Sequence, residues 1–155
     1  MSQSPFPGAF PHQHHDPRGL LERIQAQVRE RIEEAVEMAA LELMVALREA
    51  RGRPAPQTSS AKDREEFVAM AGELLTHLGG AFRRELPDGQ RGGLDEAERI
   101  EGDERARVLA GQVFLARRLP DYWQRFETHV AAYRGGRLQA PGPRRRGLGR
   151  LLGRE

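Results

Sequence analysis

The sequence predicts an all-α protein, a four-helix antiparallel bundle with a long first helix and disordered N- and C-terminal tails. Apolar residues recur at steps of three and four along most of the chain, which is the spacing of a helix with one buried face. No segment alternates polar and apolar residues with a period of two, and isoleucine occurs only three times, so strands are not expected. The connections between helical patterns are short, which favours antiparallel neighbours.

The chain divides into three parts. Residues 1–18 contain four prolines and no periodic apolar pattern, so we expect a disordered N-terminal tail. Residues 19–134 hold the helical patterns and form the predicted bundle domain. Residues 135–155 are rich in Gly, Pro and Arg and form the predicted flexible C-terminal tail.

The first helix is expected over residues 20–50. Its first half carries an apolar stripe on an otherwise charged surface, and residues 38–47 are apolar nearly all round. The second half should therefore be the more deeply buried end. Gly52 and Pro54 follow the last periodic residue and are typical of a helix end.

The second helix is expected from Ser60, a good N-cap residue, to about Leu86. Gly79-Gly80 in its middle predicts either a kink or the close approach of another backbone. Pro87-Asp88-Gly89 then predicts a turn.

The third helical pattern is expected to break at Gly102-Asp103 into residues 94–101 and 103–119. The fourth helix, 121–134, is expected to end at Gly135-Gly136. Its aromatic stripe is predicted to lie in the core, with a partner-binding face as the alternative. The stripe consists of Trp123, Phe126, Val130 and Tyr133.

Composition and charge limit the function classes. The 155 residues include no cysteine, which excludes disulfides and thiolate metal sites. No apolar run approaches the roughly 20 residues of a membrane span, and no secretory signal pattern begins the sequence, so we expect a cytoplasmic protein. Residues 134–155 carry seven arginines and one glutamate, whereas the preceding residues are net acidic.

The residues that catalysis commonly needs are poorly placed. Every serine falls in a predicted tail or linker, asparagine is absent, and the one lysine, Lys62, begins an exposed helix. A phosphate-binding loop would need a strand before it, and none is expected. We therefore predict a non-catalytic interaction protein without a cofactor.

A metal-handling bundle is the rival prediction. Its candidate ligands are Glu42, Glu73, His77 and His129, which could converge inside a bundle. Di-iron bundles use Glu-x-x-His on two helices, but here Glu73 and His77 are four residues apart, and His129 follows Glu127 by two. We therefore predict no metal site and retain these four residues only as the alternative.

The C-terminal tail is the predicted attachment element. If it became helical, its leucines would lie on one face and its arginines on the other, although its glycines disfavour a free helix. A partner protein is the expected target; an anionic membrane and nucleic acid rank behind it, the latter because the tail has no aromatic residue for base stacking. The candidate partner-binding residues are Arg144, Arg145, Arg146, Leu148, Arg150, Leu151, Leu152 and Arg154.

One string in this tail carries a resemblance. Leu148-Gly149-Arg150-Leu151-Leu152-Gly153, which follows a Pro- and Gly-rich linker, resembles the cargo-loading tails of encapsulin cargo proteins. The resemblance implies that the helical body would be a cargo domain held on a protein shell. The missing Glu-x-x-His pairs disfavour a cargo domain of the ferritin-like kind.

The first helix predicts self-association. At about 30 residues it would span roughly 45 Å, which exceeds the length of the other expected helices. Part of its apolar stripe would then have no partner within the chain. A homodimer along this helix would bury that stripe.

Overall fold

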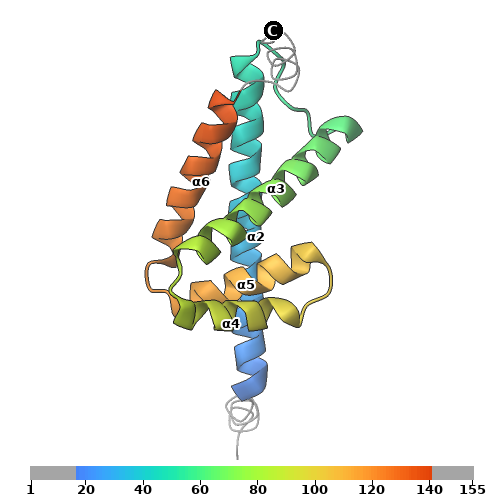
Figure 1. Cartoon of the computed structure of the whole chain (residues 1–155). Coiled ribbons are helices and arrows are strands. Elements are labelled where there is room, and N and C mark those ends of the chain that lie inside the picture. Colours follow the sequence, from blue (N-terminus) through green and yellow to red (C-terminus); the bar gives the residue numbers. More distant parts are fainter. Residues whose placement is uncertain (1–16, 141–155) are drawn as a thin grey trace, which may run out of the picture.

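The computed structural model describes residues 17–140, which form five α-helices and no strand (Figure 1). The prediction of an all-α protein is confirmed. The helices are α2 (Pro17–Ala50), α3 (Ala61–Glu85), α4 (Asp88–Arg99), α5 (Glu104–Arg118) and α6 (Tyr122–Gln139). Most of both predicted tails falls on residues 1–16 and 141–155, which lie outside the described residues.

The predicted four helices become five because α4 and α5 are separate helices. The expected break at Gly102-Asp103 occurs, and Asp103 begins α5 by accepting a hydrogen bond from the backbone N–H of Ala106 at 2.8 Å. The expected turn after Pro87 is wrong, because α4 begins at Asp88 instead. Proline suits this position, since its fixed φ matches the entry to a helix and its missing N–H would have no intrahelical partner.

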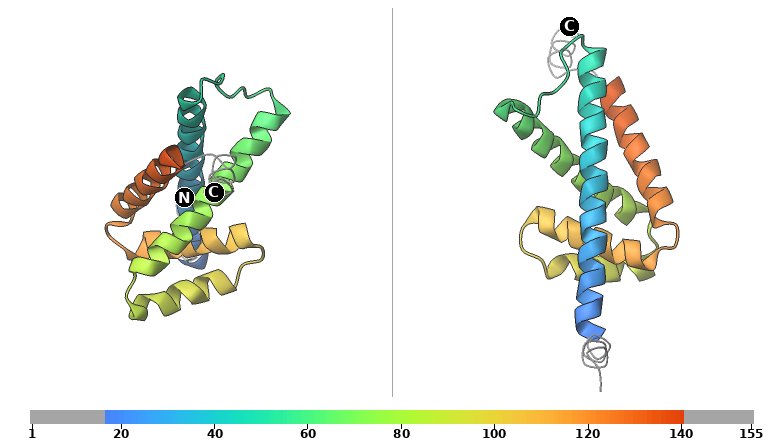
Figure 2. Two further views of the ribbon diagram at one scale, coloured as in Figure 1. Left: turned by 45° about the horizontal axis from the view of Figure 1, so that its top comes forward. Right: turned by 180° about the vertical axis from the view of Figure 1, so that it is seen from behind.

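The helices do not form the predicted antiparallel bundle. α6 runs in the same direction as α2, because the Arg31 guanidinium lies 4.1 Å from the Trp123 ring centroid while Glu42 pairs with Arg134 at 3.0 Å. α3 runs the opposite way, and α4 and α5 lie side by side across α2 near its N-terminal half (Figure 1 and Figure 2). This crossing pair returns the chain to the end where α3 finished, so α6 repeats the direction of α2.

Close contacts at glycine hold the crossing layer together. α3 is continuous through Gly79-Gly80, and a methyl group on Gly79 would lie 3.1 Å from the Val108 side chain of α5. Gly93 of α4 similarly lies against the Phe114 ring of α5. At Gly79 the close neighbour is a side chain of α5, whereas the sequence predicted a kink or the close approach of another backbone.

The core combines apolar side chains with one buried polar pair. The Tyr122 hydroxyl donates a 2.9 Å hydrogen bond to the side-chain oxygen of Gln112, and both residues are buried. The Tyr122 ring also stacks on Phe82, with centroids 5.1 Å apart. The largest fully buried apolar side chains are Tyr122, Phe82, Ile32, Leu43, Met44, Leu74, Leu75, Leu78, Leu94, Leu115 and Val36.

α6 extends five residues beyond its predicted end. It passes through Gly135-Gly136 to Gln139, because Arg137 in its last turns pairs with Glu73 of α3 at 2.8 Å and donates to the Tyr133 hydroxyl at 2.9 Å. These contacts offset the helix cost of two glycines, about 1 kcal/mol each. At the other boundary, α2 begins at Pro17, inside the predicted N-terminal tail.

Candidate partner-binding surfaces

The two glutamates of the alternative metal site are each held by an arginine of α6. Glu42 of α2 accepts from Arg134 at 3.0 Å, and Glu73 of α3 accepts from Arg137 at 2.8 Å. An ion pair to a guanidinium satisfies a carboxylate and places a positive charge where a cation would have to bind. These glutamates therefore fasten α6 to its neighbours.

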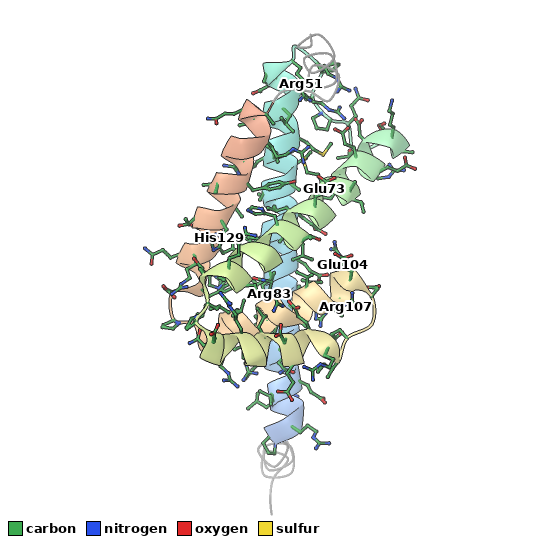
Figure 3. All side chains as sticks on the ribbon, viewed as in Figure 1. Arg51, Glu73, Arg83, Glu104, Arg107 and His129 are labelled. Atoms are coloured by element: carbon green, nitrogen blue, oxygen red, sulfur yellow. The ribbon has the colours of Figure 1, made fainter. Side chains whose placement is uncertain are left out.

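The two histidines lie on the interface between α3 and α6. His129 contacts Glu85 at 3.0 Å through Nε2, and its ring meets the Phe82 ring edge-on at 4.8 Å (Figure 3). The His77 ring lies 4.9 Å from that of Tyr133, and burial lowers the pKa of His77 below its usual value, so the neutral ring is favoured.

Glu42 and His129 thus lie in separate pairs with Arg134 and Glu85, whereas Glu73 and His77 both contact Tyr133, whose hydroxyl donates to Glu73 at 3.3 Å. Within residues 17–140, no three or more His, Asp and Glu side chains are placed to hold a metal ion. None of the described helices has the length and apolar character required to cross a membrane.

The first turns of α2 present an uncovered apolar surface. Leu20, Leu21 and Ile24 are 49%, 41% and 39% exposed, and we call these three residues the α2 N-terminal face. Val28 continues the same stripe, half-buried, and Ile32 continues it into the core. Figure 1 and Figure 2 show this segment of α2 projecting beyond the layer of α4 and α5.

A groove of about 410 Å³ runs between α2 and α6. Its floor is apolar and includes Met38, Trp123 and Val130, and its rim carries Glu42 and Glu127. Met38 is 59% exposed, so this floor is open to solvent. We call it the α2–α6 groove.

A second groove, of about 500 Å³, lies between the start of α2 and the α4–α5 pair. Its apolar wall includes Phe114, and its cationic side chains are Arg29, Arg117 and Arg118. Arg118 lies over the Phe114 ring at 4.7 Å, and Arg29 lies 3.7 Å from Glu101. We call it the α2–α5 groove.

The aromatic stripe of α6 divides between core and surface. Phe126 and Val130 are buried, as predicted, whereas Trp123 and Tyr133 are half-buried at the edges of the core. The sequence analysis missed Tyr122, one of the most deeply buried side chains. Its signal was available, because Tyr122 precedes Phe126 by four residues and Val130 by eight, which places all three on one helical face.

The predicted attachment residues Arg144 to Arg154 lie outside the described residues and stay a prediction. No protein-family model matches this chain, and neither a curated protein nor a solved structure is significantly similar to it. Its fold and surfaces define an all-α protein with open apolar surfaces on its long helix.

Proposed function

We propose that this chain is a non-catalytic helical interaction protein that self-associates through the α2 N-terminal face and docks a partner protein through its basic C-terminal tail. The observation that carries the proposal is the apolar stripe of α2, which leaves the core at Ile32 and continues uncovered to Leu20. Contiguous exposed apolar surface on a projecting helix is typical of an interaction site.

A second copy of the same helix fits this face. In an antiparallel pair of α2 segments centred near residue 26, Ile24 would meet Val28 of the second copy. The pairing would rest on apolar contacts, because Arg29 of this segment already pairs with Glu101 of its own chain. Each contact occurs twice by symmetry, as in an isologous dimer.

A charge at the centre of the face tests this arrangement by sedimentation equilibrium. Ile24→Glu buries an unpaired carboxylate in the proposed interface and should weaken self-association at least tenfold. Val68→Glu is the matched control, since Val68 of α3 is 61% exposed and far along the chain from the α2 N-terminal face. A chain that is monomeric at every concentration contradicts the self-association proposal.

The tail is tested separately. Serine at Leu148, Leu151 and Leu152 removes the apolar anchors and leaves every arginine in place. We expect this variant to lose retention of the partner protein while keeping its helical content by circular dichroism. Equal retention by both proteins contradicts docking through the leucines, and retention lost only at high salt would indicate charge alone.

A further inference from the structure

The α2–α6 groove has unneutralised acidic charge at its rim. Glu127 of α6 lines the groove, and Glu34 of α2 lies beside it, next to the lining residue Ala35 and one turn before Met38; both glutamates are exposed and form no ion pair within residues 17–140. The arginines beside the groove are already engaged, because Arg134 pairs with Glu42 and the Arg31 guanidinium lies over Trp123. The groove therefore favours a ligand that is apolar along its centre and positively charged at its edges.

A segment of this composition follows α6 directly. Residues 144–155 hold three leucines and five arginines. They are joined to the end of α6 at Gln139 by a short Pro- and Gly-containing stretch. The charge and apolar pattern of this segment thus match the groove that runs along the same helix as far as Arg134, five residues before its end.

The reach of the chain also fits. Val130 lies ten residues before Ala140, or about 15 Å along α6. The eight residues from Ala140 to Leu148 span up to about 27 Å when extended, so Leu148 can turn back to the level of Val130. From there Leu152 would reach the level of Trp123. The extended stretch from Leu148 to Leu152 spans about 13 Å, and the helical stretch from Val130 back to Trp123 spans about 10 Å.

The larger α2–α5 groove fits this segment less well. Three arginines and two glutamates line it, so its charge is less favourable to an arginine-rich segment than that of the α2–α6 groove. It also lies farther from the end of α6, where the C-terminal tail begins. Glu42 is level with Arg134 of α6, and Arg29 lies about 20 Å farther along α2, toward its N-terminus. Charge and distance therefore both select the α2–α6 groove.

We propose that the C-terminal tail of this chain binds its own α2–α6 groove, with its leucines on the apolar floor and its arginines against Glu34 and Glu127. This inference goes beyond the proposed function, because the groove then competes with any external partner for the same leucines. The tail is available to a partner only in the fraction of molecules whose groove is empty. The apparent affinity of the tail for the partner is therefore its intrinsic affinity multiplied by that fraction.

The single tryptophan of the chain reports on the groove, because Trp123 is part of its floor. In the full chain, serine at Leu148, Leu151 and Leu152 should shift Trp123 emission to longer wavelength, since the indole becomes more hydrated. Adding a synthetic peptide of residues 144–155 to this variant should reverse the shift saturably, and a peptide with the same three serines should not.

Charge reversal locates the bound peptide. Glu127→Lys should weaken peptide binding about tenfold, whereas Glu65→Lys, an exposed glutamate on α3, is the matched control and should leave it unchanged. The measurements are made in the Ile24→Glu background, so they do not depend on self-association through the α2 N-terminal face. An unchanged Trp123 emission in the triple-serine variant, or a shift that disappears on dilution because the tail belongs to a second copy, would overturn the proposal.

Discussion

Gly92 and Gly93 are neighbours in α4 with opposite surroundings, and they make a sharp test of how α4 packs on α5. A methyl group at Gly92 would have no atom within 4 Å, whereas one at Gly93 would lie 2.6 Å from the tip of the Phe114 ring. Gly92→Ala should therefore gain only the helix propensity of alanine, about 1 kcal/mol. Gly93→Ala gains the same amount but loses roughly 2 kcal/mol to overpacking, because the Phe114 ring must shift to admit the methyl group, which gives a net loss of about 1 kcal/mol.

The two variants should thus differ by about 2 kcal/mol in the free energy of unfolding. Urea denaturation followed by circular dichroism measures this difference, and thermal melts should move about 3–5 °C in opposite directions. Combining Gly93→Ala with Phe114→Leu should recover part of the loss, because the smaller side chain vacates the contact. Equal stability of the two single variants would refute the described packing of α4 on α5.

Three further predictions concern buried or capping groups. Tyr122→Phe should cost about 1–2 kcal/mol in urea denaturation. Among residues 17–140, the side-chain amide nitrogen of buried Gln112 has no hydrogen-bond partner, and the Tyr122 hydroxyl is the one partner of its oxygen. Ser60→Ala should cost about 1 kcal/mol, because Ser60 accepts a hydrogen bond from the backbone N–H of Asp63 at 3.2 Å and begins α3, and Ser60→Asp should retain most of the stability. Burial lowers the pKa of His77 from 6.5, so the neutral ring is favoured in the folded state. The stability that this gives is complete above pH 6.5 and is lost as the pH falls through the folded-state pKa, and His77→Gln should flatten this part of a stability–pH profile.

Local features of this fold could be predicted from the sequence because their causes are local. Ser60 and Asp103 each accept a backbone hydrogen bond from the residue three positions later, so the starts of α3 and α5 follow from short stretches of sequence. At Gly79 the two local options were a kink and the close approach of another backbone, and the close neighbour is instead a side chain of α5.

The arrangement of the helices could not be predicted in the same way. The direction of α6 depends on contacts such as that between Glu42 and Arg134, which are 92 residues apart and leave no periodic signal. The end of α6 was placed too early for the same reason, because Arg137 finds Glu73 on another helix.

The candidate surfaces were predicted only in outline. The length of the first helix predicted that part of its apolar stripe would extend beyond the other helices of the chain, and Leu20, Leu21 and Ile24 are exposed. The grooves beside α2 were not foreseen, since they arise from the angles at which α5 and α6 cross it. The sequence could not show that Glu42 and Glu73, two of the four candidate metal ligands, are paired with arginines of α6.

The parallel course of α2 and α6 has a consequence for synthesis on the ribosome. α2 emerges early, but the residue that pairs with Glu42 is translated 92 positions later. At typical rates of about 5–20 residues per second, that delay lasts roughly 5–18 s. α3 and α5 emerge earlier and can cover their parts of α2, but the side of α2 that packs on α6 stays exposed for the whole delay.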